Sequence, residues 1–132
     1  MYFRHIATTS LSFLTIFSFA ICEARTKFTY EGAPISYQQV YANPENTDLQ
    51  LNYARQQAAA GDYLSAAGAL EAMLFNQPNW DSARLFYAIL IYELDDRLGA
   101  RREFEILKIR NVSEHQKNLI NYYLGELDKA GA

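Results

Sequence analysis

Three carboxylates that stand close together, Glu93, Asp95 and Asp96, are the best candidates for chemistry in this chain of 132 residues. Two neighbouring carboxyl groups can act as general acid and general base. Carboxylates at a helix end, however, are far more often the caps of an ordinary turn. His115 has no second histidine nearby to complete a metal site, and the six glycines are scattered and form no phosphate-binding loop. The residues therefore predict a protein that is not an enzyme and that holds no metal and no cofactor.

The N-terminal segment 1–24 differs from the rest of the chain. Arg4 and His5 precede an apolar run over residues 11–21, which is short for a segment that crosses a bilayer. The small residues Cys22 and Ala24 follow, at the positions that a signal peptidase recognises. This order is typical of a secretory signal peptide, so we predict cleavage near Ala24 and export to the periplasm of a bacterium. The alternative is an uncleaved N-terminal segment that anchors the chain in the membrane.

Composition limits the remaining possibilities. Cys22 is the only cysteine, and cleavage after Ala24 would leave a chain with no disulfide and no thiol nucleophile. Half of the residues are hydrophobic, and the net charge of −3 is spread along the chain. Because no basic block is present, nucleic acid is not an expected partner. The length suits one domain whose stability comes from packing.

Residues 47 to 112 repeat with a period of 34. The identical pairs at this spacing are Leu51 and Leu85, Tyr53 and Tyr87, Ala54 and Ala88, Asp62 and Asp96, Leu64 and Leu98, Ala66 and Ala100, and Glu71 and Glu105. Such a period is typical of a helix–turn–helix unit that buries its apolar face only by stacking on its neighbours. We therefore predict two pairs of helices and a fifth helix that covers the exposed face of the second pair.

Local signals predict where these elements begin and end. Residues 25–46 show no helical period and are predicted to form an extended lead-in against the first helix pair, with room for a short helix near residues 36–41. Gly61 and the pair Asp95-Asp96 are predicted turns. The predicted N-caps are Thr47 with Gln50 three residues later, Asp62, Asp81, and Ser113 with Gln116 three residues later.

Helical spacing also predicts which side chains form the core. The residues predicted to point inward are Leu51, Ala54, Ala58, Ala66, Leu70, Met73, Leu74, Leu85, Ala88, Ile89, Tyr92, Leu98, Ala100, Phe104, Leu107, Leu119, Ile120, Tyr123, Leu124 and Leu127. Gly68 and Gly99 lie inside predicted helices, where glycine costs about 0.8–1 kcal/mol relative to alanine. We expect the close approach of a paired helix to explain both glycines.

Small and large side chains recur at fixed places in the two units. The carrying residues are Gly61-Asp62-Tyr63, Ala66 with Leu70, Met73 and Pro78 in the first unit, and Ala100 with Phe104 and Leu107 in the second. From residue 47 to about residue 128 the chain thus resembles the tetratricopeptide repeat. Gln50 and Arg84 stand where that family usually has a tryptophan. The resemblance implies an all-α tetratricopeptide-repeat solenoid over residues 47–132, made of two helix–turn–helix units and a C-terminal capping helix.

A narrower resemblance involves the predicted signal peptide, the lead-in and the segments 51–55 and 84–88. These resemble the periplasmic front end of outer-membrane proteins related to the surface lipoprotein assembly modifiers, in which tetratricopeptide repeats precede a β-barrel. The likeness implies association with the outer membrane through a partner. It also leaves open that the chain is the truncated front portion of such a protein, without a function of its own.

The family resemblance implies a binding site on the inner face, which the first helix of each pair lines. The residues expected there are Asn52, Arg55, Leu85, Ile89, Tyr92 and Tyr123. A mixed face of this kind suits a peptide with apolar anchors and one acidic group. We therefore predict a non-catalytic scaffold that binds a peptide or a partner protein in the bacterial cell envelope. Because two and a half units are few for a stacked array, we also expect self-association or docking onto a partner.

Overall fold

The computed structural model describes residues 27–131, and this part of the chain is all-α. Its helices are α1 (Tyr37–Ala42), α2 (Thr47–Ala59), α3 (Tyr63–Asn76), α4 (Asp81–Glu93), α5 (Arg97–Lys108) and α6 (Glu114–Lys129). No strand occurs among the described residues, and the all-α prediction is confirmed at this level. The predicted signal peptide, residues 1–24, lies outside the described residues.

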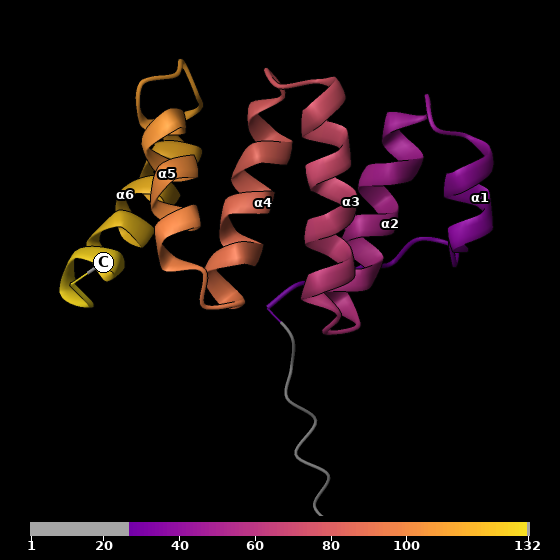
Figure 1. Ribbon diagram of the computed structural model, residues 1–132, viewed down its shortest axis with the longest axis horizontal. Coiled ribbons are helices and arrows are strands. Elements are labelled where there is room, and N and C mark those ends of the chain that lie inside the picture. The colour runs from indigo at the N-terminus through magenta and orange to yellow at the C-terminus, as the bar shows by residue number, and fades with distance from the viewer. Residues whose placement is uncertain (1–26, 132) are drawn as a thin grey trace, which may run out of the picture.

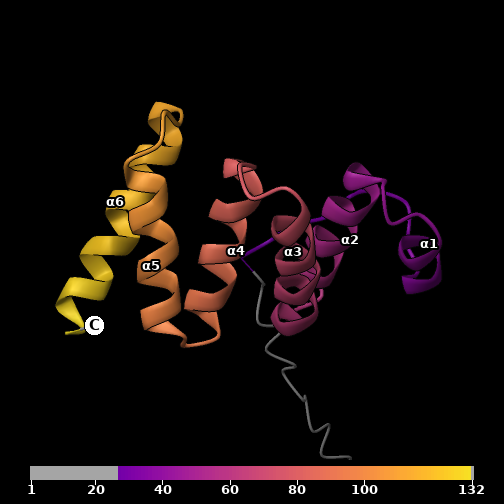
Figure 2. The same ribbon diagram turned by 45° about the horizontal axis from the view of Figure 1, so that its top comes forward.

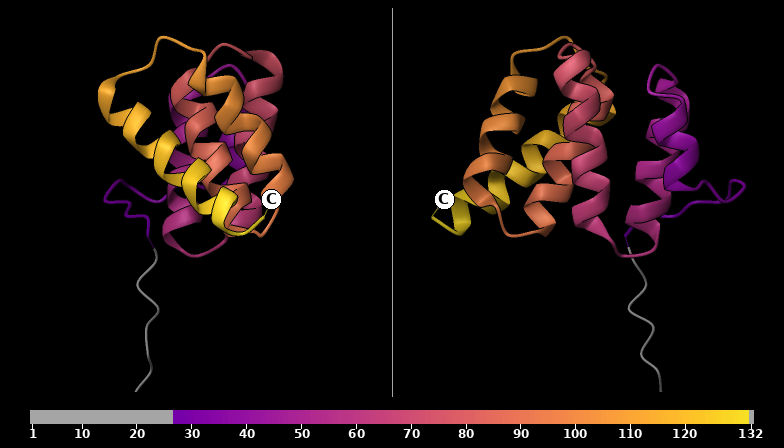
Figure 3. Two further views of the ribbon diagram at one scale, coloured as in Figure 1. Left: turned by 90° about the vertical axis from the view of Figure 1, so that its left-hand side faces the viewer. Right: turned by 45° about the vertical axis from the view of Figure 1, so that its right-hand side comes forward.

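The helices stand side by side in a row that follows the order of the chain (Figure 1). α2 packs on α3, α3 on α4 and α4 on α5, so that the chain forms two neighbouring helical hairpins. α2 and α6 are set back on the same side of the row (Figure 2). α6 lies obliquely across α5 and also touches α4, which covers the end of the row as predicted (Figure 3).

The turns inside the two hairpins are built alike. Gly61 and Asp95, which are one repeat period apart, both have a positive φ, 83° and 65°. The next residues, Asp62 and Asp96, each accept a hydrogen bond from the backbone N–H three residues later, at 3.0 and 2.9 Å. The left-handed residue ends one helix, and the carboxylate satisfies a free N–H at the start of the next. The predicted turns and the predicted cap Asp62 are confirmed.

The loops that lead into α2 and α4 share a second plan. Pro44 and Pro78 are also separated by one repeat period. The side-chain amide of Gln50 donates to the carbonyl oxygen of Pro44, and the guanidinium of Arg84 donates to that of Pro78 at 2.7 Å. Each hairpin therefore ties its entry loop to the first turn of its first helix through the same position of the repeat.

The helix α1 corresponds to the last turns of α3. The two helices end at equivalent positions of the repeat, α1 at Ala42 and α3 at Asn76. The residues that follow have nearly the same backbone angles: φ −131° and ψ 61° at Asn43, and φ −132° and ψ 72° at Gln77. The structural period thus begins inside the lead-in, upstream of residue 47.

One apolar core runs between the helices. Its largest fully buried side chains are Phe104, Leu70, Met73, Leu90, Leu107, Ile120 and Leu127, of which only Leu90 is missing from the predicted core. Leu51, Ile89, Tyr92 and Leu119, all predicted to point inward, are partly buried and pack against this core. The prediction for Leu98 is wrong, since its side chain is 75% exposed. Leu98 stands two residues before the buried Ala100, which places it about 200° around the helix from the core.

Two of the predicted N-caps are wrong. Asn46, not Thr47, caps α2, because its side chain accepts a hydrogen bond from a backbone N–H at 3.0 Å, while Gln50 turns to the preceding loop. Trp80, not Asp81, occupies the cap position of α4 and makes no side-chain cap bond there. Asp81 is the first helical residue, where its negative charge still suits the positive end of the helix. The predicted capping box at the start of α6 is confirmed.

The close approach of a paired helix explains neither Gly68 nor Gly99. A Cβ added at Gly68 would meet nothing within 4 Å. A Cβ added at Gly99 would clash with a carboxylate oxygen of Asp96, the cap of the same helix. Ser65 holds the equivalent position of the first hairpin and bonds to its own cap. The space at Gly99 therefore depends on how the cap carboxylate is turned.

Candidate binding face

Two of the six residues predicted to bind a peptide, Leu85 and Tyr123, are core residues with exposed fractions of 7% and 6%. The Tyr123 ring stacks on Phe104 with centroids 5.1 Å apart and meets Tyr92 edge-on at 5.0 Å. Burial raises the pKa of the Tyr123 hydroxyl. We call the side of the row that α2, α4 and α6 form the inner face. The rings of Tyr92, Phe104 and Tyr123 pack below the surface of this face.

The other predicted residues lie closer to solvent. Arg55 is exposed and donates from Nη1 to Oδ1 of Asn52 at 3.2 Å, and Ile89 is partly buried. Arg55 also borders a hollow of about 350 Å³ between α2 and α4, whose far side is formed by Phe86 and Ser82. Of the six predicted residues, Arg55 alone lines this hollow, and Lys27, Phe28 and Thr29 of the lead-in border it as well.

The lead-in runs along this same side of the row (Figure 3, left). The ring of Phe28 lies against two other rings, that of Tyr63 at 5.6 Å and that of Phe86 at 5.4 Å between centroids. Phe28 is partly buried and packs against the core. An aromatic slot on the inner face is therefore occupied by a residue of the chain itself.

The residue before Phe28 makes a charged contact at the far end of α4. The ammonium of Lys27 donates to Glu93 at 2.5 Å and lies 5.9 Å from the centre of the Tyr123 ring. The hydrogen bond to Glu93 raises the pKa of Lys27, against the opposing effect of burial. Glu93 is 20% exposed, which gives this pair partial shelter from water.

A third contact holds the backbone of the lead-in. The side-chain amide of Gln56 donates from Nε2 to the carbonyl oxygen of Ile35 and accepts from the N–H of Ile35 at Oε1, both at 2.8 Å. An amide side chain that pairs with both polar groups of one residue replaces the partners that a neighbouring strand would supply. Neither Gln56 nor Phe86 is among the six predicted residues. Helical spacing offers a signal for Gln56, since it lies four residues after Asn52 on the same face of α2.

A larger hollow lies elsewhere, between α1, α2 and α3. It has a volume of about 790 Å³ and is lined by residues that carry no charge, with Gly68, Ala69 and Ala72 leaving it open on the side of α3. It lacks the charged groups that would orient a ligand. We therefore favour the smaller inner face, where charge, aromatic rings and a backbone clamp occur together.

A smaller hollow of about 240 Å³ repeats this cleft at the equivalent place in the second hairpin. The lining residues that correspond are Tyr37 and Glu71, Val40 and Leu74, Tyr41 and Phe75, Gln50 and Arg84, Tyr53 and Tyr87, Gly68 and Arg102, and Ala69 and Glu103. In the second hairpin, charged side chains thus fill the space that small or uncharged side chains leave open in the first hairpin.

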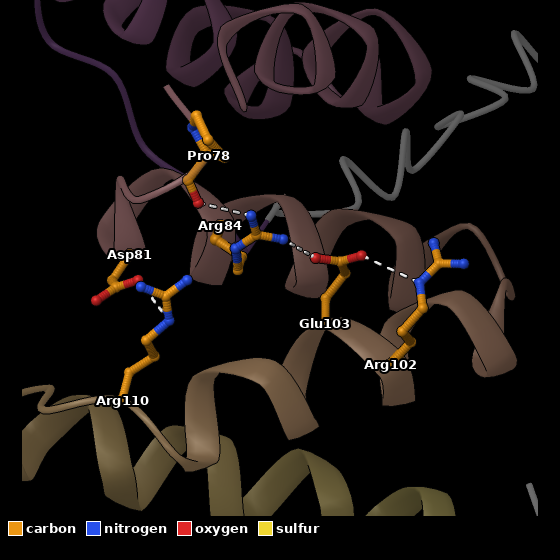
Figure 4. A network of polar contacts seen from close by, with 6 residues as sticks. All are labelled: Pro78, Asp81, Arg84, Arg102, Glu103 and Arg110. Carbon is orange, nitrogen blue, oxygen red and sulfur yellow. Dashed lines mark hydrogen bonds and ion pairs between the residues drawn. The ribbon is translucent and has the colours of Figure 1, made fainter. Parts of the chain in front are cut away.

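The charged side chains of the second hairpin form a network of polar contacts (Figure 4). Glu103 is buried and accepts hydrogen bonds from Arg84 on α4 and, at 3.3 Å, from its neighbour Arg102. At the start of α4, Asp81 faces Arg110 at 3.8 Å. Each carboxylate faces an arginine, and the pair of Arg84 and Glu103 joins α4 to α5.

The three candidate carboxylates are likewise engaged. Glu93 pairs with Lys27, Asp95 accepts from Arg97 at 2.8 Å, and Asp96 caps α5. Across residues 27–131, no three His, Cys, Asp or Glu side chains gather closely enough to hold a metal ion. None of the described helices has the length and apolar character needed to cross a membrane.

Comparisons of the chain with protein-family models, with curated proteins and with solved structures found no match.

Proposed function

We propose that this chain is a tetratricopeptide-repeat protein whose inner face binds non-helical polypeptide. The support for the repeat is its recurrence in several independent features: the turns at Gly61 and Asp95, the caps that follow them, and the loop prolines Pro44 and Pro78. In such proteins the first helix of each unit lines a concave surface that receives a ligand.

The observation that carries the binding proposal is the lead-in itself. Residues 27–35 form no helix, and three kinds of contact hold them against the side of α2, α4 and α6: an ion pair, an aromatic slot and a backbone clamp. A surface that holds one polypeptide segment in this way has the chemistry to hold another. The proposed role is non-catalytic and needs neither a metal nor a cofactor.

The proposed place of action is the bacterial cell envelope. It rests on the signal-peptide pattern of residues 1–24 and on the narrower resemblance to the front end of outer-membrane proteins. The proposed partner is therefore an exported protein or peptide, and contact with the outer membrane would be through that partner.

An array of short unrelated peptides, probed with the purified protein, tests the binding proposal. We expect a subset of peptides to bind and the variants Arg55→Ala and Tyr92→Ala to bind them more weakly, because both side chains belong to the inner face. Tyr41→Ala is the matched control, since Tyr41 lies on α1 with 77% of its surface exposed. Binding that all three variants retain, or an array with no bound peptide, would contradict the proposal.

A further inference from the structure

The lead-in touches the inner face at two ends and bows away between them. Lys27 and Phe28 form one anchor, and Ile35 forms the other. The segment from residue 31 to residue 34 between the anchors is exposed. The Tyr30 hydroxyl donates to the carbonyl oxygen of Ala33 at 2.9 Å, so this part of the lead-in makes a hydrogen bond within itself. The inner face therefore contacts a short anchor at each end of the segment.

We propose that residues 27–35 are an internal occupant of the inner face, and that the same face takes from a partner protein a segment in which a basic residue directly precedes an aromatic residue. This inference rests on the binding function proposed above and adds the class of ligand and a form of regulation. The partner segment must displace the lead-in in order to bind.

Charge complementarity specifies the basic residue. Glu93, at the end of α4, is the carboxylate that faces Lys27. The Lys27 ammonium also lies over the ring of Tyr123, which contacts the ring of Tyr122. A cation at this place gains both the carboxylate and the electron-rich face of an aromatic ring. An acidic residue here would meet Glu93 as a like charge. At this end of the face the proposed ligand therefore carries a basic group, in addition to the apolar anchors and acidic group expected from the mixed face.

Geometry specifies the aromatic residue and the backbone requirement. The slot between Tyr63 and Phe86 places both rings within the range of edge-on or tilted aromatic pairs, which add to the gain from burial alone. The Gln56 amide bonds only backbone atoms of the segment. Seven residues after the aromatic anchor, the face therefore selects for available backbone N–H and C=O groups.

Tethering makes the lead-in a competitor. A segment joined to its own binding site by a few residues has an effective concentration of the order of millimolar. A free ligand can then bind only the fraction of molecules whose face is open, and its apparent affinity falls by that fraction. Removing an anchor of the lead-in should raise the apparent affinity for a partner segment without any new contact.

Fluorescence anisotropy with a labelled synthetic peptide of residues 26–36 tests this inference on the purified protein. We expect weak binding to the wild type and at least about tenfold tighter binding to Phe28→Ala, because the variant opens the face. Lys27→Glu in the protein is the second opening variant. It involves an exposed side chain, so it keeps the test decisive if Phe28→Ala changes the circular dichroism of the helices. A scrambled peptide and a peptide with Phe28→Ala are the controls, and neither should bind.

Charge exchange tests the basic residue. In the protein that already carries Phe28→Ala, we expect Glu93→Lys to weaken binding of the natural peptide about tenfold and to restore binding of a peptide with Lys27→Glu. The inference is overturned if both opening variants bind the natural peptide no better than the wild type, or if the scrambled peptide binds as well. If the opened protein fails with this peptide but binds members of the unrelated array through Arg55 and Tyr92, only this inference falls. If it binds none of them, the proposed function falls as well.

Discussion

The first hairpin, α2 with α3, and the second, α4 with α5, share their turns and entry loops but differ in what lies between their helices. Gln50 and Ala69 in the first hairpin correspond to Arg84 and Glu103 in the second. The arginine and glutamate form a buried ion pair, whereas the smaller residues leave the cleft of about 790 Å³ beside α1.

The difference separates two kinds of requirement. Positions that set backbone conformation keep the same role in both hairpins, because a left-handed turn residue and a helix cap are needed wherever a hairpin forms. Positions that fill space differ, because the two hairpins have different neighbours. On its N-terminal side the second hairpin packs on α3, whereas the first hairpin has only the short α1 on that side. Substitutions at equivalent positions of the two hairpins can test this distinction.

Truncation of the central core residue should weaken the second hairpin more than the first. Phe104 and Leu70 correspond at the period of 34, and both are fully buried. We expect Phe104→Ala to lower the free energy of unfolding by about 4 kcal/mol and Leu70→Ala by about 3 kcal/mol, because Phe104 also loses its stacked partner Tyr123. Urea unfolding followed by circular dichroism measures both. A larger loss for Leu70→Ala would contradict the comparison.

Breaking the buried ion pair should cost more than removing it altogether. We expect Glu103→Ala to lower the free energy of unfolding by about 3 kcal/mol, since Arg84 then keeps a charge in a poorly hydrated site. The double variant Arg84→Gln with Glu103→Ala gives the second hairpin the residues of the first and should recover more than half of that loss. Glu105→Ala, which removes an exposed carboxylate, is the control and should change stability by less than about 0.5 kcal/mol. Additive losses in the double variant would show that the pair is not coupled.

Gly68 and Gly99 should respond to substitution in the same direction but to different extents. Gly68→Ala should raise the free energy of unfolding by about 1 kcal/mol, because the new Cβ meets nothing and alanine favours the helix. Gly99→Ser should raise it by about 0.5 kcal/mol, provided that Asp96 turns to bond the new hydroxyl as Asp62 bonds Ser65 at 2.7 Å. Thermal unfolding measures both shifts. Destabilisation by Gly68→Ala would mean that the cleft beside α1 is filled.

The first hairpin should lose stability in acid through its cap. Hydrogen bonds from the backbone N–H and hydroxyl of Ser65 lower the pKa of Asp62 below its ordinary value of 3.8. The stabilisation from the ionised cap is therefore complete above the unfolded-state pKa and is lost as the pH falls through the lower folded-state pKa. Asp62→Asn keeps a capping oxygen but does not titrate. We expect its difference in stability from the wild type to change only in this acid range, as measured by urea unfolding at a series of pH values.

Local signals in the sequence predicted much of the fold. The turn at Gly61, the cap Asp62, the capping box at Ser113 and most of the core follow from contacts within a few residues or from helical spacing. The errors are also local and have physical causes. Leu98 repeats Leu64 in sequence, and both side chains are exposed, which shows that an identical pair at the repeat period need not be a core position.

The candidate site was less predictable because its contacts join distant parts of the chain. Lys27 and Glu93 are 66 residues apart, and Ile35 and Gln56 are 21 apart. The lead-in has no period that would indicate which face it covers. The six predicted residues locate the inner face through the resemblance alone, and they include Leu85 and Tyr123, which helical spacing correctly places in the core.

The central claim is that polypeptide binds on the side of α2, α4 and α6 and not in the larger cleft beside α1. Amide chemical-shift mapping by NMR tests it most directly, with the Phe28→Ala variant titrated with the peptide of residues 26–36. We expect the largest shifts at Gln56, Phe86 and Glu93, which contact the lead-in in the wild type. Shifts that concentrate instead at Tyr53, Gly68 and Ala72, which line the cleft beside α1, would contradict it.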